Sequence, residues 1–255
     1  MVRKVETGIP GLDKMLQGGF PEGRMILVMG GPGTGKTIFS SQFLHHGTKL
    51  GEKTVYISLD ETKPHFLDEM LTFGWKFKEL EQDNRFTFID ASNIRRIPEE
   101  AKVGRLQVTG KELARERLKK SIFTMLDGTQ VRAIDRFVGD LGAQRVVLDS
   151  ISGLTFRFPE AWEKRQAMLE IMEALDNVGA TCLIISEAIT IGEERQVQAE
   201  EYLSHGAILL QTLKTGERAV RIVKMRGTEA DSIPRPYQIG QTGIEVYSDQ
   251  SIYQT

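Results

Sequence analysis

The sequence has little cysteine and no long hydrophobic run, and each absence excludes a class of protein. Cys182 is the single cysteine among 255 residues, so an internal disulfide is excluded. No apolar run approaches the roughly 20 residues that span a bilayer, and the charged stretch Met1 to Thr7 does not resemble a signal peptide. We therefore expect a cytoplasmic protein without membrane contact, in which Cys182 is a small hydrophobic residue of a buried strand.

The chain also lacks a strong net charge and a set of metal-binding histidines. Its formal net charge of −2 implies no bulk attraction to nucleic acid or to an anionic membrane. The four histidines, His45, His46, His65 and His205, do not form a zinc-ligand pattern. No Pro/Ser linker and no internal repeat interrupts the chain. We expect one α/β domain over residues 1–255.

The most informative stretch is a short apolar run, Met25 to Met29, that leads into a glycine-rich loop. The pattern Gly30-x-x-x-x-Gly35-Lys36-Thr37 has the spacing of a P-loop, and a helix-like run follows it. Glycines let the backbone approach a phosphate, and the N–H groups at a helix start favour an anion. We expect Lys36 to reach the β and γ phosphates and the Thr37 hydroxyl to bind Mg²⁺. The predicted nucleotide contacts here are Gly31, Pro32, Gly33, Thr34, Gly35, Lys36, Thr37 and Ile38.

Acidic residues follow two other strand-like runs. The apolar run Arg145–Asp149 ends on Asp149, which we predict to hold the Mg²⁺ shell; the alternative is that it caps the next turn. The run Lys53–Leu59 is followed by Asp60 and Glu61. We predict that this pair orients or deprotonates the attacking water, the alternative being that both acids are only solvated.

The order of the remaining elements predicts the fold. Helical patterns cover residues 64–73 and 160–177, and strand patterns cover 85–90 and 181–186. From His205 onward the alternation is strand-like, at 207–210, 219–223 and 243–247. We therefore predict an α/β fold with a mostly parallel central sheet, helices flanking it and an antiparallel C-terminal extension.

Residues 93–142 break this pattern and read as a partly helical insertion, with helices expected at 111–126 and 131–141. Residues 95–120 contain nine Lys or Arg against four Glu. A solvated helix face and a partner or nucleic-acid contact both explain this excess. We predict contact with a protein partner or another subunit rather than with duplex DNA.

Several motifs together resemble one known family. They are Thr7-Gly8-Ile9-Pro10-Gly11-Leu12-Asp13, the P-loop, Leu59-Asp60-Glu61-Thr62, Leu148-Asp149-Ser150, Ser186-Glu187 and Lys224-Met225-Arg226-Gly227-Thr228. Their combination resembles a KaiC-like ATPase of the RecA superfamily.

The resemblance implies a RecA-type P-loop NTPase core that uses ATP or ADP with Mg²⁺ and hydrolyses ATP slowly. It also implies a ring, expected to be a hexamer, with ATP at the subunit boundaries. It adds Ser186, Lys224 and Arg226 to the expected nucleotide contacts, the last two reaching across a boundary. The residues expected to be catalytic are Lys36, Asp60, Glu61, Lys224 and Arg226.

This chain departs from the family pattern in two ways. The family commonly has Glu-Glu where this chain has Asp60-Glu61, so which acid acts stays open, with Glu61 favoured for its reach. The circadian clock protein KaiC has two such domains and this chain has one, so neither clock function nor autophosphorylation is inferred.

Three further functions compete with an ATP-hydrolysing ring regulator. They are a RecA/RadA-like DNA-handling ATPase, a kinase that uses the same ATP site, and a nucleotide-gated module without turnover. The stretch from Glu187 to His205 has five Glu and one Arg, which would repel DNA. Adenine is the expected base, because a guanine-selective Asn-Lys-x-Asp motif is absent. Lys224 and Arg226 stand two apart on a predicted strand, where the alternative to an anion contact is solvated edge-strand charge.

Overall fold

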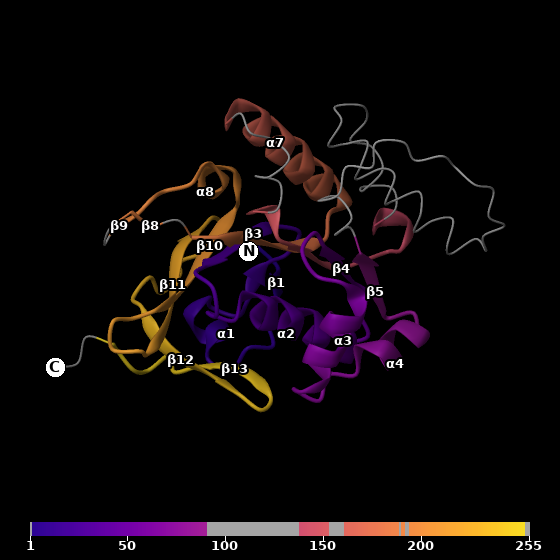
Figure 1. Ribbon diagram of the computed structural model, residues 1–255, viewed down its shortest axis with the longest axis horizontal. Helices are drawn as coiled ribbons and strands as arrows, with labels where there is room; N and C mark the ends of the chain where they lie inside the picture. The colour runs from indigo at the N-terminus through magenta and orange to yellow at the C-terminus, as the bar shows by residue number, and fades with distance from the viewer. Residues whose placement is uncertain (1, 91–137, 153–160, 189, 192–193, 253–255) are drawn as a thin grey trace.

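The computed structural model describes residues 2–90, 138–152, 161–188, 190–191 and 194–252, which form a sheet with helices on both faces (Figure 1). The strands are β1 Lys4–Val5, β2 Phe20–Pro21, β3 Met25–Gly30, β4 Thr54–Ser58, β5 Phe86–Asp90, β6 Arg145–Asp149, β7 Thr181–Glu187, β8 Thr190–Ile191, β9 Glu194–Arg195, β10 Gly206–Thr212, β11 Arg218–Met225, β12 Arg235–Gly240 and β13 Gly243–Val246. The helices are α1 Leu12–Met15, α2 Lys36–Lys49, α3 Lys63–Leu71, α4 Phe77–Gln82, α7 Ala161–Val178 and α8 Ala199–Leu203.

Within these ranges the main sheet has the strand order β13-β12-β11-β10-β3-β7-β6-β4-β5. All neighbours from β10 to β5 are parallel, and β10, β11, β12 and β13 pair antiparallel. The predicted parallel sheet with an antiparallel C-terminal extension is confirmed. Parallel strands covered on both faces are apolar along their whole length, and β3, β4 and β6 are buried at every residue.

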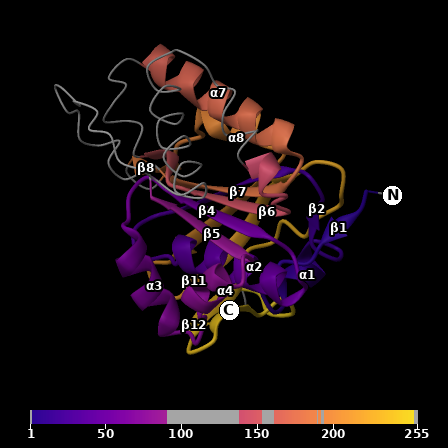
Figure 2. The same cartoon turned by 90° about the vertical axis from the view of Figure 1, so that its right-hand side faces the viewer.

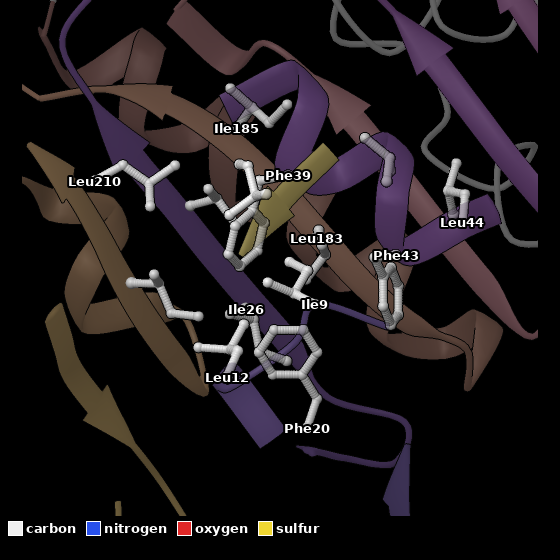
Figure 3. Packing of buried hydrophobic residues seen from close by; sticks show 14 of the residues in the cluster. Ile9, Leu12, Phe20, Ile26, Phe39, Phe43, Leu44, Leu183, Ile185 and Leu210 are labelled. Atoms are coloured by element: carbon white, nitrogen blue, oxygen red, sulfur yellow. The ribbon is translucent and has the colours of Figure 1, made fainter. Parts of the chain in front are cut away.

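Alternate residues along the central strands point to opposite faces of the sheet and pack in two hydrophobic cores, one on each face. On β3, Leu27 and Met29 pack with α7, whereas Ile26 and Val28 pack with α2. Figure 2 shows α7 and α8 on one side of the sheet and α2, α3 and α4 on the other. In Figure 3, Phe39 and Phe43 of α2 point toward the strands, one helical turn apart.

Most predicted elements are confirmed to within two residues. The sequence pattern did not predict α4, α8, β12 or the two-residue strands β1, β2, β8 and β9. Strand β12 contains Pro236 and polar residues, and it forms because it pairs with β11 and β13. Cys182 is a buried strand residue as predicted, and burial raises the pKa of its thiol to about 12.

The predicted helix at 111–126, the basic segment 95–120 and most of the 93–142 insertion lie outside the described residues. Of the helix predicted at 131–141, the structure describes only 138–141, of which 138–140 are helical. Among the helices that the structure describes, none is long and apolar enough to cross a membrane.

Candidate nucleotide and metal site

The glycine-rich loop connects the buried strand β3 to α2. Gly33 and Gly35 have φ angles of +72° and +83°, which residues with a side chain rarely adopt. A Cβ at Gly30 would lie 2.5 Å from Thr34 Oγ1 and 2.7 Å from the Leu210 oxygen, so this position needs glycine as well. A Cβ at Gly31 or Gly33 would meet no atom within 4 Å. The loop is thus tightly held at its start and open along Gly31 and Gly33, where a phosphate would approach.

Residues of the C-terminal strand β12 contact this loop. Tyr237 on β12 is buried, and its hydroxyl donates to the Thr34 carbonyl oxygen at 2.5 Å. The Ile239 side chain lies beside Gly35, where an added Cβ would come within 2.7 Å of it. The antiparallel extension therefore supports the loop, although no motif in it indicated this role.

Lys36 folds back over the loop at the start of α2. Its Nζ donates to the carbonyl oxygens of Gly30 and Gly31, each at 2.9 Å. Burial lowers the pKa of Lys36, and the charges of Glu187 and Asp149 act in the opposite direction. The ammonium group is therefore already at the loop, where a cation can meet phosphate oxygens.

Thr37 and Asp149 meet between α2 and the end of β6. Thr37 Oγ1 donates to Asp149 Oδ2 at 2.9 Å. Burial raises the pKa of Asp149, while hydrogen bonds from Tyr56 and Thr37 act in the opposite direction. A hydroxyl and a carboxylate are hard oxygen ligands, and they fit Mg²⁺. In the described part of the chain no cluster of three or more His, Cys, Asp or Glu residues could hold a metal, so an Mg²⁺ here would also need phosphate and water ligands.

Tyr56 is a site residue that sequence reasoning missed. It is fully buried in the middle of β4, and its hydroxyl donates to the same Oδ2 of Asp149. Burial and the charge of Asp149 hold the pKa of Tyr56 well above its ordinary value, so the hydroxyl keeps its proton. The available signal was a tyrosine inside a buried strand, because a buried phenol needs a hydrogen-bond partner.

Asp60 and Glu61 lie in the turn after β4 and have different surroundings. Ser58 Oγ accepts from the Glu61 N–H at 2.8 Å and donates to the Glu61 carbonyl oxygen at 2.7 Å, which fixes the turn. Ser150 Oγ donates to Asp60 Oδ2 at 2.6 Å. Burial raises the pKa of the partly buried Glu61 carboxyl, and the charges of Glu69 and Asp149 add to this.

Ser186 lies at the end of β7, next to the P-loop strand. Its Cα pairs with Met29, and the following Glu187 pairs with Gly30. Ser186 is buried, with Gln198 Oε1 at 3.5 Å from its Oγ. The register thus places Ser186 beside the start of the loop, and its predicted nucleotide contact remains a prediction.

Lys224 and Arg226 lie at the C-terminal end of α8. Lys224 Nζ donates to the carbonyl oxygens of Glu201 and Ser204 at 2.8 and 2.6 Å, and Arg226 Nη2 donates to that of Tyr202 at 3.4 Å. Strand β11 ends at Met225, so the prediction that both cations stand on the strand was wrong for Arg226.

The pairing of β11 with β10, and of β10 with β3, shows where Lys224 and Arg226 lie relative to the P-loop. Lys224 pairs with Ala207, which pairs with Leu27 of β3, whereas the loop begins beyond Gly30. Since parallel strands point the same way, the cations lie toward the opposite end of β3 from the loop. The structure does not bring them together with the chain's own P-loop lysine.

Comparisons with known proteins agree with this geometry. The family profile described as "ATPase: KaiC" matches residues 5–251. The crystal structure of the KaiC-like protein PH0186 from Pyrococcus horikoshii has a TM-score of 0.75 and 31% sequence identity, covering 97% of this chain and 100% of that one.

Curated relatives cover the whole length of the chain. UPF0273 protein PH0284 of Pyrococcus horikoshii is 33% identical over 257 residues, which are 98% of this chain and 96% of that protein. The circadian clock oscillator protein KaiC of Parasynechococcus marenigrum is 29% identical over 252 residues, which are 96% of this chain and 45% of that protein.

Proposed function

The chain belongs to the KaiC family of ATPases, and from this premise we propose that it binds ATP with Mg²⁺, hydrolyses it slowly and acts as a ring-forming regulatory ATPase. The observation that carries the proposal is the hydrogen bond between Thr37 and Asp149 beside the P-loop lysine. A phosphate cradle, a cation and an oxygen pair for Mg²⁺ thereby converge from β3, α2 and β6.

Each group has a role in this proposal. Lys36 neutralises phosphate charge, and Mg²⁺, when bound, polarises the phosphate oxygens. A hydroxyl has one proton and two lone pairs, so Thr37 can donate to Asp149 while its oxygen faces the ion. Glu61, or Asp60 beside it, orients the attacking water. Ser186 contacts the nucleotide from the neighbouring strand.

The placement of the two cations supports the proposed ring. Phosphoryl transfer needs positive charge on the γ-phosphate beyond the P-loop lysine. Lys224 and Arg226 lie away from their own loop, which supports a contact with the ATP of a neighbouring subunit. We propose a hexamer with ATP at its boundaries and a protein partner rather than nucleic acid as the object of regulation.

A pair of measurements tests the enzymatic proposal. We expect wild-type protein to bind fluorescent ATP analogues and to release phosphate in the presence of Mg²⁺. The double variant Asp60→Asn, Glu61→Gln should bind ATP normally and release phosphate about 10²–10⁴-fold more slowly, because a positioned base contributes that factor. Lys36→Ala should lose nucleotide binding and keep its fold, since the lysine supports no core.

Five results would contradict parts of the proposal. Lys36→Ala with wild-type hydrolysis would exclude the P-loop assignment, and loss of ATP binding in the double variant would give the two acids a structural role. Wild-type protein that binds ATP without releasing phosphate would be a nucleotide-gated module. Transfer of labelled phosphate to protein would indicate a kinase, and salt-dependent DNA binding would favour the recombinase alternative.

A further inference from the structure

Tyr56 and Thr37 donate to one and the same oxygen, Oδ2 of Asp149. The two donors come from different elements, since Thr37 begins α2 and Tyr56 lies inside β4. Asp149 is almost fully buried, and a buried carboxylate is stable as an anion only when hydrogen bonds replace its lost hydration. Among the described residues, Tyr56 thus supplies one of the two side-chain hydrogen bonds that stabilise this charge.

The position of the Tyr56 hydroxyl is set by aromatic packing. Its ring stacks on Phe88 with centroids 5.5 Å apart and an interplanar angle of 11°, and lies 4.4 Å from the Phe66 ring centroid. All three rings are buried. Packing against these two rings keeps the phenol oxygen beside Asp149, so the donor is in place before any ligand arrives.

The two donors differ in what they can do when a metal binds. Thr37 faces the nucleotide loop, and its oxygen is the one expected to meet the ion. Tyr56 approaches Asp149 from the core between β4 and α3, away from the loop. We propose that Tyr56 is a positioning residue for Mg²⁺: it holds the Asp149 carboxylate in the orientation in which the ion is bound. This inference rests on the proposed function, because it concerns the same metal.

The same strand face also supports the catalytic turn. Side chains two apart on a strand point to one side, so Tyr56 and Ser58 share a face of β4. Tyr56 orients Asp149, and Ser58 bonds both backbone groups of Glu61. One strand therefore fixes the metal carboxylate and the turn that carries the expected base.

The test is the affinity of the ADP complex for Mn²⁺, measured by electron paramagnetic resonance, in wild-type protein and in Tyr56→Phe. The substitution removes the hydroxyl and keeps the ring packing. We expect the Mn²⁺ dissociation constant to rise about 10-fold, since partners of metal ligands contribute 10–100-fold. The affinity for ADP in the presence of EDTA should be unchanged.

Three further variants separate positioning from general loss of stability. Thr48→Val also removes a buried hydroxyl, at the end of α2 opposite to Thr37, and should leave the Mn²⁺ constant unchanged. Phe88→Leu loosens the core around Tyr56 and keeps its hydroxyl, so it should lower the melting temperature with a smaller change in Mn²⁺ affinity. In an Asp149→Asn background, adding Tyr56→Phe should change Mn²⁺ affinity less than twofold, because the pair is already broken.

Wild-type Mn²⁺ affinity in folded Tyr56→Phe would overturn the positioning role. An equal rise of the Mn²⁺ constant in Phe88→Leu would also overturn it, because loss of core packing would then suffice. If wild-type protein bound ADP but no Mn²⁺, the metal part of the proposed function would fail before this inference is reached.

Discussion

Asp60 and Glu61 are adjacent in the chain, yet they make different contacts. The Asp60 carboxylate accepts a hydrogen bond from Ser150, which directly follows Asp149 in the chain. Glu61 has its backbone fixed by Ser58 and a carboxyl that is only partly buried. These contacts favour Glu61 as the residue that meets water, in line with its longer side chain.

We predict that Glu61→Gln slows hydrolysis more than Asp60→Asn does, by about 10-fold or more, with ATP binding kept in both. The comparison is made by phosphate release at saturating ATP. A larger loss in Asp60→Asn would reverse the assignment.

The pKa of Glu61 adds a prediction about pH. A base acts only when deprotonated, and the pKa of Glu61 is raised by burial, so hydrolysis should fall as the pH drops through a value above the ordinary glutamate range of about 4.3. Glu61→Gln has no group to titrate there, and its residual rate should lack this acidic limb. An identical limb in wild type and Glu61→Gln would assign the titration to another group.

At the scale of elements, α2 is held by segments far from it in the chain. Gln42 Nε2 donates to the carbonyl oxygens of Gly8 and Ile244 at 2.9 and 3.0 Å, and its Oε1 accepts from the Ile244 N–H at 2.7 Å. One side chain thereby ties the P-loop helix to the N-terminal segment and to β13.

We predict that Gln42→Ala lowers the free energy of unfolding by about 2 kcal/mol, because buried backbone groups lose their partners. Urea titration measures this as a lower midpoint at an unchanged slope. The control Gln238→Ala removes an exposed glutamine of β12 and should stay within about 0.5 kcal/mol of wild type. Equal midpoints for the two variants would mean that Gln42 does not anchor the helix.

At the scale of the whole molecule, the P-loop and the two expected catalytic cations, Lys224 and Arg226, lie apart. The P-loop follows the carboxyl end of β3, and Lys224 and Arg226 lie beside α8 toward the other end of the strand. We propose that residues 1–255 form a single domain, supported by a family match that runs from residue 5 to 251. In this single domain the P-loop lies at one end of β3, and the two cations lie toward the other end of that strand.

We predict that Arg226→Ala slows hydrolysis on the order of 10³-fold, the usual contribution of such an arginine, while the P-loop still binds ATP. Mixing it with Asp60→Asn, Glu61→Gln should restore part of the phosphate release, because mixed rings contain boundaries with one intact loop and one intact arginine.

The control is Arg221→Ala, an exposed arginine of the same strand β11, which should hydrolyse ATP at the wild-type rate. Native mass spectrometry establishes ring size and subunit exchange. A mixture that exchanges subunits and stays inactive at every ratio would exclude action across a boundary.

Much of the candidate nucleotide site could be predicted from local sequence patterns. The P-loop, the aspartate at the end of β6 and the acidic pair after β4 each lie within a few residues of the strand that presents them. Strand periodicity and strand ends are local properties, and parallel neighbours collect such ends at one edge of the sheet. That is why Thr37 and Asp149, which are 112 residues apart in the chain, could both be assigned to one predicted Mg²⁺ site before the structure showed their hydrogen bond.

Other contacts depended on which strands became neighbours. Tyr56 meets Asp149 because β4 lies beside β6, and Tyr237 reaches Thr34 across 203 residues because the C-terminal strands continue the sheet. Arg145 opens an apolar strand, yet it is fully buried because Glu52, the Glu6 oxygen and the Phe43 oxygen surround its guanidinium group.

There is a physical reason why some features could be predicted from the sequence and others could not. Motif and periodicity are set by covalent neighbours, so the amino-acid order determined the phosphate loop, the strand ends and the two faces of each strand. Hydrogen-bond partners of buried polar groups are chosen by packing between distant segments, which no local pattern records. Tertiary structure therefore decided that Tyr56 donates a hydrogen bond to Asp149, and that Lys224 and Arg226 lie at α8 instead of at their own P-loop.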